Sequence, residues 1–213
     1  MEMVINRIRK SKRTDEDFLV HCFREAGIQT DHVLPQETQY MKPQGSWQEP
    51  HQLAQLLILL SKYQIETFLE IGTFFGVTTS LITSFLSRYK LKKAISIDIF
   101  SRDIPDVEKV KKILPIDFQL KTSQDFKDQH FDLCFIDGDH NYQGVKTDFE
   151  NVGQFSTFCA FHDIINHQVP GVIQFWNEIK KQYPYHEFTH ADTFGIGLLE
   201  VQTPTKIKPI KFI

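Results

Sequence analysis

Short apolar runs that alternate with helical patterns constrain the fold of this chain more than any other feature of its sequence. Strands that are buried on both faces are nearly continuous apolar runs, and strands that alternate with helices pair in parallel. The sequence therefore predicts a parallel sheet that is covered by helices on both faces. The expected strands are residues 67–71, 93–99, 117–120, 131–136, 158–161, 185–189 and 195–201.

Helices are expected where apolar residues recur at helical spacing. Pro50 suits the first position of one of them. The loop 191–194 between the last two strands is too short for a parallel crossover, so that pair is expected to be antiparallel. The predicted fold class is α/β and Rossmann-like, with a seven-stranded, mostly parallel sheet and an antiparallel last strand. The expected helices are residues 15–26, 50–60, 77–88, 109–114, 145–152 and 172–179.

The length of 213 residues suits one domain with a short accessory segment. Residues 1–48 are polar and mixed, with Pro, Gly and Gln concentrated in 31–49, and are expected to form an N-terminal cap of helix and loop. Residues 49–213 are then the ligand-binding domain.

Charge and composition exclude several partners. The net charge of −3 provides no basic excess for nucleic acid. The longest apolar stretch, residues 53–60, is too short to span a bilayer. The cysteines Cys22, Cys134 and Cys159 form no CxxC pair, so they are expected to be reduced core residues of a cytoplasmic protein.

The first functional signal follows the first strand, because open α/β sheets bind ligands at the carboxyl ends of their strands. There Gly72 would allow a sharp turn, and Gly76 would let the next helix start close to the strand. No Gly-Lys-Ser/Thr follows, so this is not a phosphate-binding P-loop, and the three-glycine dinucleotide pattern is incomplete. The alternative is an ordinary strand-to-helix turn with two convenient glycines.

Acidic and polar residues follow the next two strands. Asp98 ends the second strand, where Rossmann-like folds place a carboxylate that accepts hydrogen bonds from both ribose hydroxyls. Thr122, Ser123 and Gln124 follow the third strand and offer small polar groups near an adenine. The alternatives are a solvent-facing acid and a plain loop.

The densest group of functional side chains follows the fourth and fifth strands. Asp137, Asp139 and His140 follow the fourth strand, and His162 and Asp163 end the fifth. Adjacent strands would bring Asp137 and Asp163 together, and two carboxylates beside an imidazole suit a divalent cation. Asp139 is expected instead to cap the next helix.

Together these segments resemble class I S-adenosylmethionine-dependent methyltransferases over roughly residues 47–201. FLEIGTFFGVTTSLI resembles the first motif of that family, ISIDIF the second and FDLCFIDGDHNYQGVKTDFE the fourth. CAFHDI followed by GVIQFW is similar to the fifth region. The IDGDH run and HDI are closest to the small-molecule O-methyltransferase-like subfamily with methyltransferase domain 24-like sequences.

The resemblance implies a set of site residues. The residues that would shape the S-adenosylmethionine pocket or bind the cofactor are Glu70, Gly72, Thr73, Gly76, Asp98, Ser123 and Asp137. Asp137, Asp163 and His162 would hold Mg²⁺ if the enzyme uses a metal, although Ile164 stands where metal-dependent relatives carry an Asn ligand. His140 or His162 would be the catalytic base, because neutral imidazole is available at pH 7.

The implied function is methyl transfer from S-adenosylmethionine to a small molecule, at a hydroxyl oxygen. One alternative is an NAD-dependent oxidoreductase, which would need a fuller glycine pattern in the first turn. Another is a nucleotide-binding module without catalysis. The sequence does not decide whether the chain forms a homodimer. It also does not decide whether the N-terminal cap is a substrate lid or an interface.

Overall fold

The computed structural model describes residues 1–28, 46–101 and 107–206. These residues form one seven-stranded sheet in the order β3-β2-β1-β4-β5-β7-β6. Every strand is parallel to its neighbours except β7, which runs antiparallel to both β5 and β6. The expected fold class is therefore confirmed. The strands are β1 (Thr67–Ile71), β2 (Lys93–Asp98), β3 (Ile116–Leu120), β4 (Leu133–Ile136), β5 (Phe158–His162), β6 (Tyr185–His190) and β7 (Thr193–Glu200).

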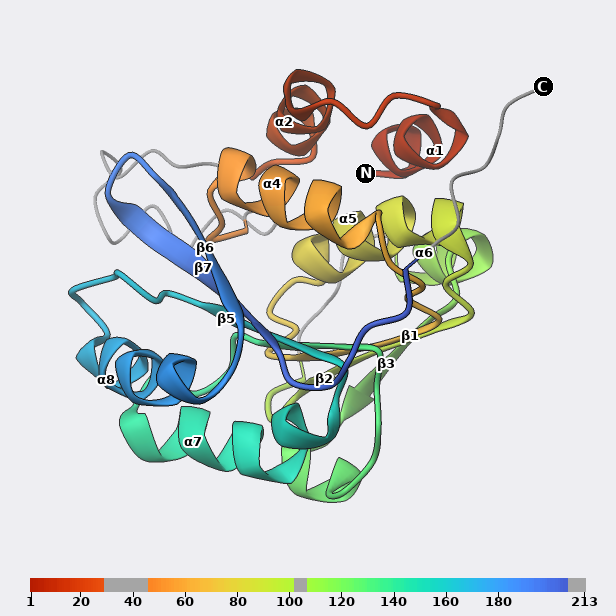
Figure 1. Ribbon diagram of the computed structural model, residues 1–213. Coiled ribbons are helices and arrows are strands. Elements are labelled where there is room, and N and C mark those ends of the chain that lie inside the picture. Colours follow the sequence, from red (N-terminus) through yellow and green to blue (C-terminus); the bar gives the residue numbers. More distant parts are fainter. Residues whose placement is uncertain (29–45, 102–106, 207–213) are drawn as a thin grey trace.

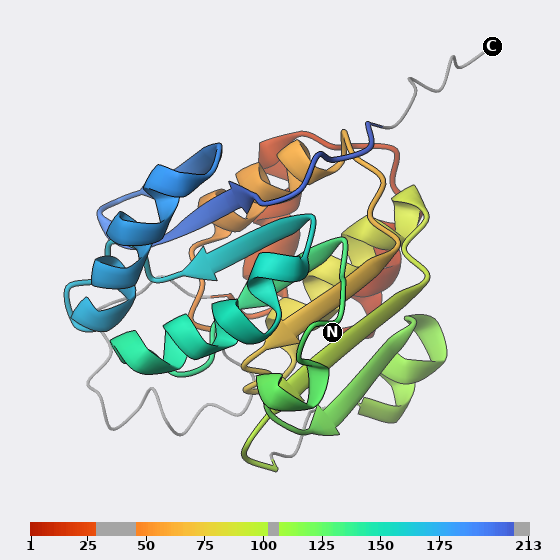
Figure 2. The same ribbon diagram turned by 60° about the horizontal axis from the view of Figure 1, so that its bottom comes forward.

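Alternating side chains along the central strands supply two hydrophobic layers. In β1, Phe68 faces one layer and Leu69 faces the other. Three helices cover the first face and two cover the second, so the sheet is buried on both sides (Figure 1). Figure 2 shows the strands side by side with α7 in front of them. The first face carries α4 (Pro50–Leu60), α5 (Val77–Leu86) and α6 (Val107–Ile113), and the second carries α7 (Tyr142–Asn151) and α8 (Pro170–Ile179).

The N-terminal segment adds an outer layer of two helices over α4 and α5 (Figure 1). The helix α2 (Glu16–Glu25) was expected, whereas α1 (Glu2–Lys10) was not. Its apolar stripe is short and is interrupted by charged residues, yet Ile5 and Ile8 are fully buried in the same core as α5. Of the loop expected at 31–49, residues 31–45 lie outside the described residues.

Helix α7 begins three residues before the expected start, and its cap differs from the expectation. The Asn141 side chain accepts the backbone N–H of Gly144 at 2.8 Å, so Asn141 and not Asp139 is the N-cap. Asp139 instead accepts the backbone N–H of Asn141 at 3.0 Å. The two residues form one turn, in which the acid orients the capping amide.

The cysteines and the helix lengths can also be compared with the expectations for the chain as a whole. Cys22, Cys134 and Cys159 are all buried and unpaired, as expected. In the described ranges, no helix combines the length and the apolar character that crossing a membrane requires.

Candidate active site

The site forms where the strand order reverses, between β1 and β4. Gly72 leaves β1 with φ +100°, and its N–H donates to the Ile97 carbonyl at 2.8 Å. A Cβ at Gly72 would lie 2.0 Å from the carbonyl oxygen of Asp137 at the end of β4. Glycine is therefore required here by both conformation and space. The sequence predicts that Gly72 allows close approach of a ligand, and in the structure it also allows close approach of the neighbouring strand.

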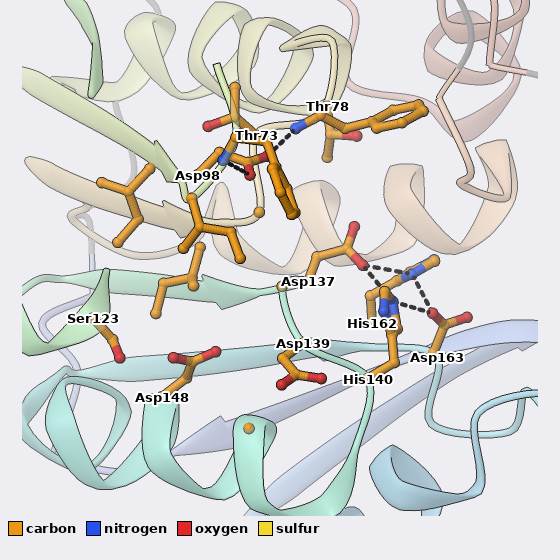
Figure 3. Close-up of a pocket in the computed structure, with 18 of the residues that line it drawn as sticks. Thr73, Thr78, Asp98, Ser123, Asp137, Asp139, His140, Asp148, His162 and Asp163 are labelled. Atoms are coloured by element: carbon orange, nitrogen blue, oxygen red, sulfur yellow. Dashed lines mark hydrogen bonds and ion pairs between the residues drawn. The ribbon is translucent and has the colours of Figure 1, made fainter. Parts of the chain in front are cut away.

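A cavity of about 1070 Å³ opens at this edge of the sheet (Figure 3). Ligand pockets of about 300–1,000 Å³ hold drug-sized molecules, so there is room for a nucleotide cofactor and a second small molecule. Most of the expected site residues line it: Gly72, Thr73, Asp98, Ser123, Asp137, His140, His162 and Asp163.

At one end of the cavity, the Asp98 carboxylate is held by two backbone amides. Its Oδ2 accepts the N–H of Phe74 at 3.0 Å, and its Oδ1 accepts the N–H of Phe100 at 2.9 Å. Each oxygen keeps a lone pair for another donor. Asp98 is therefore a fixed acceptor on the cavity wall, as a ribose-binding acid requires.

The polar group after β3 extends this end of the cavity. The Ser123 hydroxyl accepts the side-chain amide of Asn151 at 3.0 Å. Asp148 of α7, which sequence reasoning missed, also lines the cavity near Ser123 (Figure 3). Burial raises the pKa of Asp148 to about 6, although a hydrogen bond from Ser123 opposes the shift. Asp148 lies one helical turn beyond Gly144, and only its place near the end of the FDLCFIDGDHNYQGVKTDFE segment could have marked it.

Glu70 and Gly76 are not among the described residues that line the cavity, so they could shape it only from behind. Glu70 lies beneath it, 1% exposed, because its position in β1 points toward α5. Its Oε2 accepts the hydroxyl of Ser96 at 2.6 Å and that of Thr79, and Ser96 in turn contacts the Thr73 hydroxyl at 2.7 Å. Glu70 thus supports the turn after β1 from below. Burial raises its pKa to about 8.

At the other end of the cavity, two carboxylates and two imidazoles converge from two segments, one after β4 and one at the end of β5 (Figure 3). His140 Nε2 lies 3.0 Å from Asp163 Oδ2 and 3.6 Å from Asp137 Oδ1. His162 Nδ1 lies 3.1 Å from Asp137 Oδ1 and 3.3 Å from Asp163 Oδ2. The expectation that adjacent strands bring Asp137 and Asp163 together is therefore met.

The charges of this cluster control its protons. The carboxylates of Asp137 and Asp163 raise the pKa of His140 to about 10. Burial would lower the pKa of His162, but Asp163 and Asp137 outweigh it and raise that pKa to about 10 as well. Burial of Asp137 and Asp163 would raise the pKa values of these carboxyl groups. The neighbouring imidazoles outweigh that effect and hold both pKa values below the usual range. Both histidines are protonated at pH 7 in this arrangement, so the assumption of a neutral imidazole is wrong for it.

The donor atoms suited to one cation come from Asp137, His140 and Asp163, all within 4.8 Å of one another. His140 therefore stands in the place expected for His162. The His162 side chain is only 2% exposed and packs between Phe135 and Phe194, and neither ring nitrogen makes a well-directed hydrogen bond. Two carboxylates and an imidazole fit a divalent ion such as Mg²⁺ or Mn²⁺ in donor type.

Two amides that sequence reasoning missed support the carboxylates. The Asn166 side chain donates to Asp163 Oδ1 at 2.8 Å, although the position directly after the acid, Ile164, is apolar and buried. The Gln48 side chain, 1% exposed, donates to Asp137 Oδ2 at 2.9 Å. An amide three residues after an acid is a signal that could have been read, whereas nothing in the sequence links Gln48 to Asp137.

Backbone strain also concentrates at the cavity. Phe74, Asp163 and Phe194 line it with φ values of +49°, +66° and +47°. Non-glycine residues seldom adopt this region, and strained residues gather at functional sites. The strain at Asp163 falls on one of the two carboxylates that contact both imidazoles.

Comparisons with known proteins agree with this geometry. Residues 69–164 match the sequence family described as Methyltransferase domain. No curated protein matches the chain.

Solved structures share the fold at low identity. The O-methyltransferase TomG of Streptomyces achromogenes, which is involved in tomaymycin synthesis, is 16% identical, with a TM-score of 0.56 over 78% of this chain and 86% of that one. An O-methyltransferase of Bacillus cereus is 14% identical, with a TM-score of 0.53 over 93% of this chain and 96% of that one. The methyltransferase PaMTH1 of Podospora anserina is 11% identical, with a TM-score of 0.57 over 95% of each chain.

The domain match spans the strands whose carboxyl ends build the cavity, from β1 to β5. The strand order, the antiparallel β7 and the acid after β2 agree with it. Residues 69–164 therefore match a methyltransferase domain, and they lie within a fold that solved O-methyltransferase structures share.

Proposed function

We propose that the protein transfers the methyl group of S-adenosylmethionine to a hydroxyl oxygen of a small molecule. The observation that carries the proposal is one cavity with an anchored acid, Asp98, at one end and the Asp137–His140–His162–Asp163 cluster at the other. The TomG structure contains S-adenosylmethionine and that of the Bacillus cereus enzyme contains its demethylated product, and both proteins are O-methyltransferases.

In this proposal the cofactor lies across the carboxyl ends of β1, β2 and β3. The Asp98 carboxylate accepts the ribose hydroxyls, and the turn at Gly72 and Thr73 faces the amino-acid part of the cofactor. Ser123 and Asp148 face the adenine. The protein supplies position and electrostatics, while the sulfonium of the cofactor supplies the electrophilic methyl group.

The acceptor then lies beside the acid–imidazole cluster, against Trp47 and Phe194. Its hydroxyl must lose a proton as the oxygen attacks the methyl carbon. His140 is the proposed base, because its side chain is 42% exposed toward the cavity, while that of His162 is buried. Since only a small fraction of His140 is neutral at pH 7, its share of the catalysis should grow with pH.

The same cluster suits a second arrangement, favoured by its donor set. Asp137, His140 and Asp163 would hold a divalent cation, and Gln48 and Asn166 would orient the two carboxylates. Such an ion would act as a Lewis acid that lowers the pKa of the acceptor hydroxyl. His140 would then be a ligand and not the base.

The experiment is a binding and turnover assay with the purified full chain. Calorimetry should detect S-adenosylmethionine and S-adenosylhomocysteine but not NAD. A screen of hydroxylated sugars, phenols and natural-product scaffolds should yield S-adenosylhomocysteine together with a methylated product. Binding of NAD in place of S-adenosylmethionine would favour the oxidoreductase alternative, and binding without any turnover would favour a non-catalytic module.

A further inference from the structure

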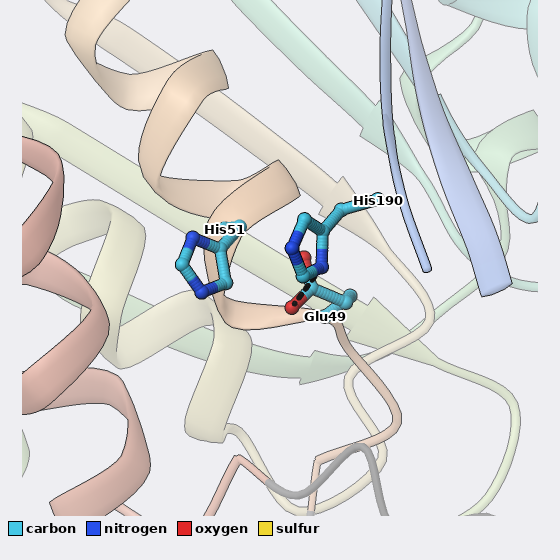
Figure 4. Close-up of side chains that lie close together, drawn as sticks. All are labelled: Glu49, His51 and His190. Carbon is cyan, nitrogen blue, oxygen red and sulfur yellow. Dashed lines mark ion pairs between the residues drawn. The ribbon is translucent and has the colours of Figure 1, made fainter. Parts of the chain in front are cut away.

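A second cluster of ligand-type side chains lies outside the active site, where the start of α4 meets the turn between β6 and β7 (Figure 4). Glu49, His51 and His190 each offer one ligand atom, and these atoms lie within 4.8 Å of one another. We propose that this cluster binds a transition-metal cation of the Zn²⁺ class.

The spacing of the donor atoms supports this site. His190 Nδ1 lies 3.3 Å from Glu49 Oε1. Zinc bonds of about 2.0–2.2 Å in tetrahedral geometry separate two donor atoms by about 3.3 Å. The rings of His51 and His190 lie face to face, with centroids 4.3 Å apart. In this stacked arrangement the in-plane lone pairs of the two rings run side by side, so one ring would have to rotate for all three donors to converge on one ion.

The groups around the cluster are arranged as outer ligands of a metal site usually are. Metal-binding histidines commonly give their other ring nitrogen to a carboxylate. His51 Nδ1 lies 2.8 Å from Glu16 Oε1, and that oxygen also accepts the side-chain amide of Gln55 at 3.2 Å. The second oxygen of Glu49 accepts the backbone N–H of Gln52 at 2.8 Å. Glu16 thus fixes His51 with its Nε2 as the remaining lone-pair donor.

Burial and donor type indicate the class of ion. The side chain of Glu49 is 2% exposed, whereas those of His51 and His190 are 24% and 45% exposed. A buried carboxylate needs compensation for its charge, and the partly open imidazoles leave a path for an ion and a fourth position for water. Two imidazoles with one carboxylate favour Zn²⁺ over the oxygen-seeking Mg²⁺ and Ca²⁺.

An ion here would join three segments that are distant in sequence. It would connect α2, through Glu16, to the start of α4 and to the β6–β7 turn. The Gln52 side chain already links α4 to the β6–β7 turn, donating to the carbonyl of Thr193 at 2.7 Å. Trp47 and Phe194, which line the cavity, lie close in sequence to these ligands. The site would therefore hold the acceptor-side wall of the active site in place.

The test measures zinc affinity of the tag-free full chain by competition with a chromophoric chelator, after removal of bound metal. Asp163→Asn is used as the background, because it disables the active-site cluster and asparagine tolerates the left-handed conformation of that residue. This background should bind one equivalent of Zn²⁺, and Co²⁺ in its place should give the visible bands of a tetrahedral nitrogen-ligated ion.

Adding His51→Ala or His190→Ala should remove the cobalt bands and weaken zinc binding by more than about 100-fold, beyond the range of an outer-ligand change. Glu16→Gln should weaken it by about 10–100-fold. His186→Ala is the matched control, since His186 lies on the same strand as His190 but pairs with Glu200 at 3.1 Å. It should leave zinc affinity unchanged.

Two results would overturn the proposal. One is an Asp163→Asn protein that binds no zinc, and the other is equal zinc affinity in the His51→Ala, His190→Ala and His186→Ala variants. If circular dichroism shows that an alanine variant does not fold, Glu49→Gln and His190→Gln replace it. These variants keep the side-chain volume and must lose zinc binding for the site to stand.

Discussion

At the scale of single residues, Asp98 combines a structural role with a free acceptor surface. It fixes the backbone amides of Phe74 and Phe100 and still faces the cavity. We expect Asp98→Asn, which keeps the shape but loses the charge, to weaken S-adenosylmethionine binding by about 1–3 kcal/mol in calorimetry. Asp117→Asn, an exposed acid on the next strand, is the control and should leave affinity unchanged. Equal affinity in both variants would remove Asp98 from the cofactor site.

The raised pKa of the buried Glu70 carboxyl predicts how the stability of the protein depends on pH. Its pKa rises from 4.5 to about 8 on folding, because burial disfavours the charged form. Between these values the unfolded chain is ionised while the folded protein keeps the proton, so this residue makes folding less favourable as pH rises. Below pH 4.5 the effect is absent, and above pH 8 it is complete.

The measurement compares the wild type with Glu70→Gln, which cannot ionise. The melting temperature of the variant minus that of the wild type should increase steadily from pH 5 to pH 8 and then level off. Other titrating groups cancel in this difference. A gap that stays constant over the range would mean that Glu70 is already ionised in the folded protein.

At the scale of elements, the turn from β1 to α5 depends on one glycine. Gly72→Ala would place its Cβ 2.0 Å from the carbonyl oxygen of Asp137, with the backbone at φ +100°. The nearest atoms are backbone and cannot rotate away. We expect a loss of at least about 2–3 kcal/mol in the free energy of unfolding, measured by urea denaturation.

Gly138→Ala is the matched control, because it lies beside the same turn with its closest contact, 3.2 Å, to the side chain of Ile71. It should cost clearly less stability than Gly72→Ala. Comparable losses in the two variants would contradict the steric argument.

The sequence predicted elements where apolar patterns were long and uniform, and it missed those that depend on tertiary contacts. The five inner strands follow from their apolar runs, since both faces of the sheet are buried there, whereas the edge strands β3 and β6 are largely exposed. Helix α1 was not predicted because Ile5 and Ile8 are buried only through tertiary packing, on α5 and α2. The start of α7 shifted because Asn141, not Asp139, satisfies its first amides.

At the scale of the whole molecule, the site depends on which strands become neighbours. Asp137 and Asp163 could be paired from the sequence because β4 and β5 are consecutive parallel strands. The sequence contains no signal for Gln48, which reaches Asp137 from the segment before α4. The same holds for His190 beside Glu49, whose contact depends on the β6–β7 turn folding back onto α4.

The melting temperature of the protein can show whether the Asp137–His140–Asp163 cluster binds a cation. If Asp137, His140 and Asp163 hold a divalent ion, Mg²⁺ should raise the melting temperature, because an ion that binds only the folded state stabilises it. Asp163→Asn should abolish the shift. His190→Ala should retain it, since Mg²⁺ prefers oxygen ligands to the second cluster's imidazoles. A melt that is independent of Mg²⁺ would favour the metal-free arrangement with His140 as base.

Proton transfer connects the charges of the cluster to turnover. In chelator-treated enzyme, turnover should rise with pH toward about 10, because Asp137 and Asp163 keep His140 protonated below that value. General base catalysis is worth about 10²–10⁴-fold, so His140→Ala should lower turnover by that factor and flatten the pH profile. S-adenosylmethionine affinity should change little, because Asp98, the proposed ribose acceptor, lies at the other end of the cavity.

The His162→Ala variant distinguishes the roles of the two histidines in the same assay. This residue is buried against both carboxylates, so its loss should move the pH profile by changing the charge beside His140, without removing the base. If His140→Ala keeps full turnover while His162→Ala loses it, the roles of the two histidines are exchanged. If neither change affects turnover at any pH, the acceptor needs no base from the protein. Methyl transfer would then rest on the alignment of the acceptor oxygen with the methyl group, for which the cavity between Asp98 and Asp163 supplies the geometry.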